Sequence, residues 1–204
     1  MSTNGASVDQ PAVVRRLDGA SASLLRDLVE TFEELQMTLR CCERLVTELA
    51  GDEPDGIVVE AVWTTALLSY ARCFSESAAG GRLSVEDLTT STPEGDVLEW
   101  HEVLMRLRDH YADPGANPRE RFTVAVTQDA EGSASGVAIT SARQPLVDDL
   151  TVRQTGAIAY ALSGLVNERI EAQQQVVSGE LEATSRSDLE KLDRVEIAAT
   201  SPGS

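Results

Sequence analysis

The spacing of apolar residues between positions 21 and 50 predicts a long amphipathic helix. Charged side chains fill the positions between them, and Gly51 with the turn-forming segment 52–56 marks the end. This heptad pattern lasts for more than three repeats, so the helix packs either in an antiparallel bundle or across a dimer interface, of which the bundle is the commoner outcome for so short a pattern. The eight residues of the pattern alternate three and four positions apart: Leu25, Leu28, Phe32, Leu35, Leu39, Cys42, Val46 and Leu49.

A second helix is predicted from about Ile57 to Ser77. Apolar residues occupy most of its circumference, a pattern typical of a helix at the centre of a core. The segment 78–81, Ala-Ala-Gly-Gly, ends it, and Ser84 with Asp87 has the spacing that caps a short helical turn.

A third helix is predicted from about Glu94 to Ala112, after a loop at 89–95. Ser91 or Thr92, just before Pro93, is a favourable start, because proline is well tolerated at the first helical position. Pro114 and Pro118 end the element. One side carries these residues: Val97, Leu98, His101, Leu104, Met105 and Arg108.

The hydrophobic period then changes from that of a helix to that of a strand. Phe122, Val124 and Val126 alternate with small or polar residues, and a flexible turn at 129–136 leads to a return strand around Val137 and Ile139. We therefore predict a β-hairpin at about 120–142. A two-stranded hairpin alone is marginal in water, so it must lie on the helices or pair with another chain.

The last long helix begins near Asp148 or Asp149, either of which can cap it, and its apolar face thins out after the glutamines at 173–175. The chain thus divides into a flexible arm at 1–20, a helical domain at 21–176 and a polar extension at 177–204. The predicted fold is mainly α, a bundle of about four main helices with the hairpin inserted before the last long helix.

Composition supports a helical core and narrows the range of partners. Hydrophobic residues make up 42% of the chain but aromatics only 4%, which favours a core of aliphatic residues and alanine. The formal net charge of −17 repels nucleic acid unless a local basic patch overrides it. The acidity favours solubility, or an acidic surface that binds a basic protein.

Several classes of site find no support in the motifs. Cys41, Cys42 and Cys73 lack metal-ligand spacing, and the two histidines lack zinc-protease spacing, so we expect no metal site. No glycine-rich phosphate loop is present, and we expect no cofactor. No apolar run suggests a signal peptide or a membrane helix, which favours a cytoplasmic protein. Lys191 is the single lysine beside many arginines, as in proteins from GC-rich, for example actinobacterial, genomes.

The residues best suited to chemistry lie at the end of the third helix. Arg108, Asp109, His110 and Asp113 crowd into about two turns, and His101 precedes Arg108 by seven positions on the same helix face. In a structural interpretation, His101 is a core residue and Arg108 pairs with a carboxylate such as Glu60 or Glu76. In a functional interpretation, these side chains line a cleft for a phosphate-like group.

An arginine followed by a polar residue, with a histidine a few residues later near a helix end, is the signature of HEPN domains. Arg108 and Asp109 resemble the first pair of that signature, and Asp113 stands where the histidine would fall. The resemblance covers roughly residues 25–170 and implies a small helical bundle. Many HEPN domains are dimeric, metal-independent ribonucleases of toxin–antitoxin, abortive-infection and CRISPR systems. The family's arginine stabilises phosphate charge while its histidine assists the attack of the 2′-hydroxyl group.

The chain departs from this signature at the histidine. Asp113 cannot supply a cationic acid near neutral pH, and His110 comes earlier than the family spacing. We therefore expect a HEPN-like, non-catalytic protein that forms homo-oligomers or binds a protein partner. One alternative is a metal-independent ribonuclease that uses Arg108 with His110 or His101, in which case nucleic acid is the partner. Another is an acidic phage or plasmid accessory protein that binds a basic partner. We expect no membrane association.

Overall fold

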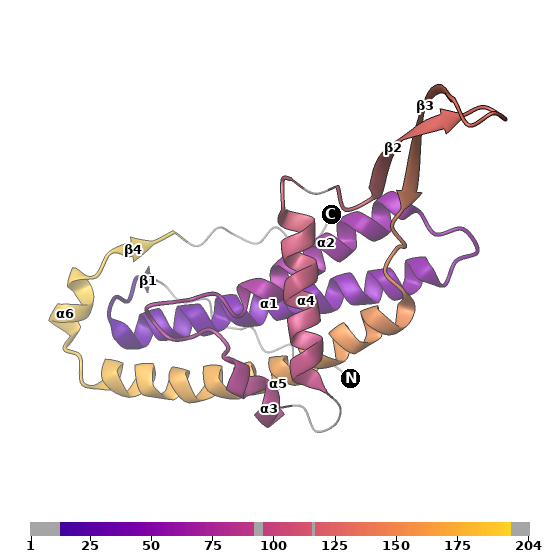
Figure 1. Cartoon of the computed structure of the whole chain (residues 1–204). Helices are drawn as coiled ribbons and strands as arrows, with labels where there is room; N and C mark the ends of the chain where they lie inside the picture. The colour runs from indigo at the N-terminus through magenta and orange to yellow at the C-terminus, as the bar shows by residue number, and fades with distance from the viewer. Residues whose placement is uncertain (1–12, 92–95, 116, 197–204) are drawn as a thin grey trace, which may run out of the picture.

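The computed structural model describes residues 13–91, 96–115 and 117–196. Two short helices accompany the four main ones, α3 (Val85–Ser91) and α6 (Arg186–Lys191). The predicted fold class, a mainly helical bundle with a hairpin before the last long helix, is confirmed (Figure 1). The main helices are α1 (Ala20–Leu49), α2 (Gly56–Arg72), α4 (Val97–Ala112) and α5 (Asp149–Glu182).

Helix α1 lies in the middle of the bundle, with α2 along one side and α5 along the other (Figure 1). Helix α2 also lies inside the core, as its apolar circumference predicted, because it packs between α1 and α4 and buries Trp63 and Tyr70. Helix α1 is buried along two rows and not only along its heptad row. The second row repeats every seven residues at Thr31, Thr38 and Leu45, all of which are buried.

The buried threonines satisfy their hydroxyl groups within their own helix. Thr31 Oγ1 donates to the carbonyl oxygen of Asp27 at 2.8 Å, and Thr38 Oγ1 to that of Glu34 at 2.9 Å. A side chain that bonds its own backbone needs no polar partner on the next helix. Two polar positions of α1 can therefore face the core without the cost of an unpaired hydroxyl group.

Helix α2 ends at Arg72, five residues before the predicted end. After Arg72 the backbone forms hydrogen bonds between residues three apart, as in a 3₁₀ turn; for example, Phe74 N donates to the carbonyl oxygen of Ala71. Further along, Leu83 N donates to the carbonyl oxygen of Cys73 at 2.8 Å. This bond holds the loop between Cys73 and Leu83 against the bundle, where Gly81 packs on α1. A Cβ atom on Gly81 would lie 2.5 Å from the Cβ of Asp27.

The predicted cap of α3 is confirmed, but the predicted start of the third main helix is wrong. Asp87 Oδ2 accepts a hydrogen bond from Ser84 N at 2.8 Å. Ser91 ends α3 instead of starting α4, and Thr92 lies outside the described residues. Asp96 caps α4 by accepting from Glu99 N, because its carboxylate satisfies an unpaired N–H group of the first turn.

The two ends of the described chain meet beside the bundle. Val14–Arg15 (β1) and Arg194–Val195 (β4) pair as a short antiparallel ribbon. Both strands lie in segments predicted as a flexible arm and a polar extension. Asp148 caps α5, as predicted, by accepting from Thr151 N, and the helix continues past position 176 to Glu182.

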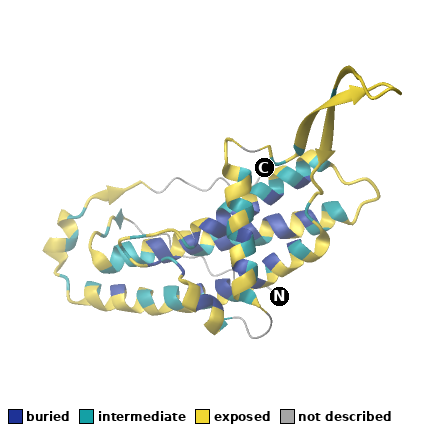
Figure 2. Cartoon of the chain, in the orientation of Figure 1, coloured by how far each residue is buried: buried dark blue, intermediate teal, exposed yellow. Residues whose placement is uncertain are grey.

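The hairpin projects away from the helices. Strands β2 (Glu120–Gln128) and β3 (Ala134–Arg143) pair in antiparallel register, and nearly all of their residues are exposed (Figure 2). Of the two predicted alternatives, the one in which the hairpin lies on the helices is therefore wrong. The physical reason is its position, because its base stands at the first turn of α2 and its strands run outward from there.

Gly81→Ala is expected to destabilise the fold by about 1–3 kcal/mol, because the new methyl group would overlap backbone and Cβ atoms of α1. Chemical unfolding followed by circular dichroism measures the change. The matched control is Gly164→Ala on the exposed side of α5, where no atom lies within 4 Å of the added Cβ. That substitution should be neutral or stabilise by up to about 1 kcal/mol. Equal effects of the two would contradict the close packing of the loop.

Candidate functional site

His101, the first of the predicted site residues, lies in the core between α4 and α2. Its Nδ1 atom lies 2.9 Å from the hydroxyl oxygen of Tyr70, and its ring centroid lies 4.5 Å from that of Phe74. Burial lowers the pKa of His101, while the charge of Glu102 opposes the shift. A neutral, hydrogen-bonded and buried ring agrees with the structural interpretation of this histidine.

Arg108 occupies the same face two turns later, but at the edge of the bundle. Its Nε atom lies 2.8 Å from Asp109 Oδ1, an ion pair without hydrogen-bond geometry. A pair with Glu60 does not form, because Glu60 holds Arg119 through two contacts, of 2.8 and 2.7 Å. The predicted pairing of Arg108 with a carboxylate of the second helix is therefore wrong for Glu60.

The other three predicted residues face solvent at the end of α4. Among the described residues, the one aromatic ring in contact with His110 is that of its neighbour Tyr111. The two rings meet edge to face, with 6.0 Å between their centroids. Asp113 ends the helix, and its Oδ1 accepts from Gly115 N at 2.8 Å. The carboxylate at the position of the family's histidine thus stabilises the turn that follows the helix.

These five residues do not converge on one cavity. His101 points into the core, Arg108 pairs with its neighbour, and His110 is exposed beyond it. Acid–base cleavage of a phosphodiester needs an anion-binding group and a proton-transfer group within reach of the same atoms. None of the three cavities described below is lined by Arg108 or by a histidine.

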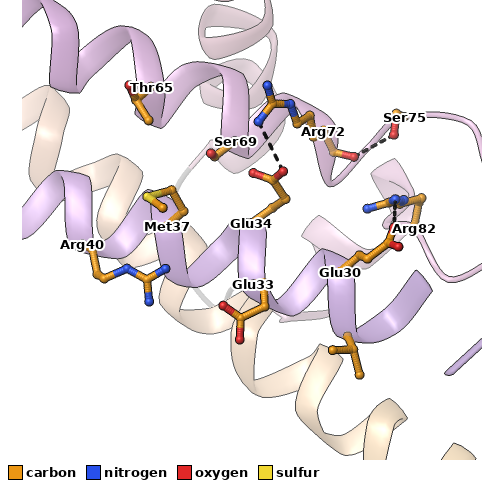
Figure 3. Close-up of a pocket in the computed structure, with 11 residues that line it drawn as sticks. Glu30, Glu33, Glu34, Met37, Arg40, Thr65, Ser69, Arg72, Ser75 and Arg82 are labelled. Atoms are coloured by element: carbon orange, nitrogen blue, oxygen red, sulfur yellow. Dashed lines mark hydrogen bonds and ion pairs between the residues drawn. The ribbon is translucent and has the colours of Figure 1, made fainter. Parts of the chain in front are cut away.

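A groove with a volume of about 560 Å³ lies elsewhere, between α1 and α2. Figure 3 shows that two of its three arginines are held by carboxylates of the groove: Arg72 lies 3.3 Å from Glu34, and Arg82 lies 2.7 Å from Glu30. Arg40 makes no ion pair with another described residue. Sequence reasoning missed this groove, although Glu30, Glu33, Met37 and Arg40 share one face of the first helix.

A second groove, of about 550 Å³, lies where α3 and α5 meet the start of α1. Its deepest polar group is Asp87, which Arg169 holds with two hydrogen bonds. Burial alone would raise the pKa of Asp87, but the bonds from Arg169 and Ser84 outweigh it and hold the pKa below its usual value. This pair ties α3 to α5 and leaves the carboxylate without spare capacity for a ligand.

A third cavity, of about 420 Å³, links the end of α4 to the base of the hairpin. Its lining includes Glu60, Tyr111, Arg119 and Leu146. The two-contact pair of Arg119 and Glu60 fixes the first residue of the hairpin region to α2. Arg119 and Glu60, neither of them among the five predicted site residues, therefore anchor the base of the hairpin.

Neither thiol chemistry nor metal binding is favoured by the remaining candidates. All three cysteines are free and buried, and burial raises the pKa of Cys42 and of Cys73 to about 12, so their reactive thiolate forms are scarce at neutral pH. In the described ranges, no group of three or more His, Cys, Asp or Glu side chains is placed to hold a metal ion. No described helix has the length and apolarity needed to cross a bilayer.

Comparison with known proteins finds no match to this chain among family models, curated proteins or solved structures.

The burial of His101 predicts a dependence of stability on pH. Because its folded pKa lies below the unfolded value of 6.5, the unfolded state binds more protons as the pH falls. The stability that the neutral ring contributes is present above about pH 6.5 and is lost as the pH falls toward the folded pKa. Urea unfolding between pH 7.5 and 5.0 should show this loss, and His101→Gln should flatten it. His110→Gln, on the exposed side of the same helix, should not, and an equal flattening would contradict the assignment.

Proposed function

We propose that this chain is a HEPN-like helical protein without catalysis, which acts by forming a homodimer and binding a protein partner. The observation that carries the proposal is the exposed hairpin, which presents a face of large apolar side chains to solvent. Monomeric soluble proteins rarely expose a contiguous apolar patch of more than a few hundred square ångströms. A surface of this kind is typical of a protein whose task is association.

The arrangement of α4 supports the absence of catalysis. A HEPN-like reaction would need a cationic or proton-transferring side chain beside the anion-binding arginine. The neighbour of Arg108 is instead the carboxylate of Asp109, which would repel a phosphate group. Asp113 is occupied in the turn after the helix.

The charge of the chain favours a protein as the partner. A net charge of −17 opposes nucleic acid over the whole surface, and it attracts a basic protein. Three free, buried cysteines fit a reducing cytoplasm, where we place the protein.

The absence of catalysis is tested with RNA. Single-stranded RNA incubated with the protein in the presence of a metal chelator should remain intact, and wild type and Arg108→Ala should give the same background. Metal-independent cleavage that Arg108→Ala abolishes would overturn the proposal and favour the ribonuclease. A catalytically competent ribonuclease assayed in the same buffer is the positive control.

The dimer is tested by the mass of the wild-type chain. Light scattering coupled to size-exclusion chromatography should give about 44 kDa, twice the 21.9 kDa of one chain, with dissociation on dilution. Because a surface pair of opposite charges contributes little to an apolar interface, higher salt should not dissociate the dimer. A strict monomer across the accessible concentration range would contradict the proposed function.

A further inference from the structure

The hairpin has two chemically different faces. The register pairs Val124 with Ile139 and Val126 with Val137, so alternate residues of both strands share a face. The opposite face carries small and polar residues such as Thr123 and Thr140. The apolar face consists of five side chains that are between 58% and 75% exposed: Phe122, Val124, Val126, Val137 and Ile139.

This face has no cover within the described chain. A two-stranded hairpin needs a third layer, because its own hydrogen bonds do not offset the ordering of two strands in water. The five side chains expose an area on the order of 500 Å², against about 800 Å² per partner in a standard interface. The apolar face thus supplies the greater part of the area that a stable dimer needs, and neighbouring backbone can supply the rest.

The absence of charge on the hairpin favours a second copy of the chain as the occupant of this face. A basic partner would need carboxylates at the contact, but segments 122–128 and 134–142 contain no charged residue, so two copies can meet there despite the net charge of −17. The uncharged segment also projects from the bundle, and a nine-residue strand spans roughly 30 Å. That length is several times the screening distance of about 8 Å at physiological ionic strength.

The charges at the two ends of the hairpin select an orientation. Asp129 and Glu131 stand at the tip, whereas at the base Arg143 pairs with Glu120 at 3.5 Å and Arg121 stands on the face opposite the apolar one. Two hairpins packed with their tips together would bring four carboxylates into proximity. Packed in opposite directions, the two acidic tips lie at opposite ends of the contact, and so do the two acidic bodies.

We infer that the apolar faces of two hairpins pack against each other about a two-fold axis, in opposite directions, with the axis near Val124 and Ile139. Self-complementary packing of one patch on itself is the rule for a two-fold dimer. Edge-to-edge pairing of the strands is excluded as the sole contact because it would leave the apolar face exposed. The inference rests on the proposed dimer and assigns its surface.

The first test places the same charge on the two faces of one strand. Val124→Glu should raise the dimer Kd by at least about 100-fold, because the two-fold axis puts the carboxylate into the interface twice. Thr123→Glu, one residue away on the opposite face, is the matched control and should change the Kd by less than about 3-fold. Sedimentation equilibrium measures both constants.

Far-ultraviolet circular dichroism distinguishes loss of the dimer from loss of the fold. The helices of both variants should keep the wild-type signal, because both substituted positions lie on the hairpin, which projects from the bundle. Should Val124→Glu lower the helical signal, the milder Val124→Thr replaces it, with an expected rise in Kd of about 10-fold. A wild-type dimer that both apolar-face variants leave intact would overturn the hairpin assignment while preserving the proposed function.

The second test measures proximity and orientation by disulfide formation. All three native cysteines are buried, so an introduced cysteine is the accessible one. Val124→Cys should form a disulfide-linked dimer on mild oxidation, because its mate lies beside it at the axis. Val126→Cys should not, since two residues from the axis the mates are roughly 13 Å apart along the strands, beyond the reach of a disulfide.

The outcomes of this second test are separable. Cross-linking by both cysteines would overturn the opposite orientation, and cross-linking by Thr123→Cys alone would overturn the choice of face. A monomeric wild type would contradict the proposed function and the hairpin interface together. If that monomer sedimented with vesicles of phosphatidylcholine and phosphatidylglycerol, and Val124→Glu did not, the face would belong to lipid.

Discussion

Burial of α1 on two sides is the constraint on which the rest of the structure depends. Because α2 and α5 both cover this helix, α4 lies across α2, and the short α3 fills the space between α4 and α5 (Figure 1). The chain then leaves α4 at the edge of the bundle, beside the first turn of α2. The hairpin begins where the helices offer no further surface, so its exposure follows from the packing of α1.

The double burial of α1 depends on small side chains. On the side of α5, Gly156 meets Cys42, where an added Cβ would lie 3.4 Å from the Cβ of the cysteine. On the side of α2, the loop at Gly81 approaches the backbone of Leu28. Larger residues at these positions would separate the helices and expose the second buried row.

Much of the fold could be predicted from the sequence, because hydrophobic period and capping residues act locally. The hairpin follows from strict alternation, and the caps at Asp87 and Asp148 follow from their spacing to the next helix. The second buried row of α1 could not be found this way. Thr31 and Thr38 look like surface residues in a sequence, and only their bonds to their own backbone make them compatible with the core.

The candidate site was less predictable, because a shared helix face does not ensure a shared environment. His101 and Arg108 are seven residues apart, but α4 crosses α2 and packs on it over only part of its length. His101 falls within the crossing and meets Tyr70, whereas Arg108 falls outside it and meets Asp109. Sequence spacing along one helix indicates which side chains point the same way. How deeply each of them is buried depends on the angle at which the next helix crosses.

The acidity of the chain bears on which element can mediate self-association. An exposed helix face in this protein carries charge at most turns, since a quarter of all residues are charged. A strand can separate its two faces residue by residue, so a strongly acidic chain can keep one face of a hairpin free of charge. In the proposed dimer, the length of the hairpin would separate the like-charged bodies by more than the screening length. Apolar contact and electrostatic repulsion are thereby kept apart in space, and high salt would relieve the repulsion without weakening the contact.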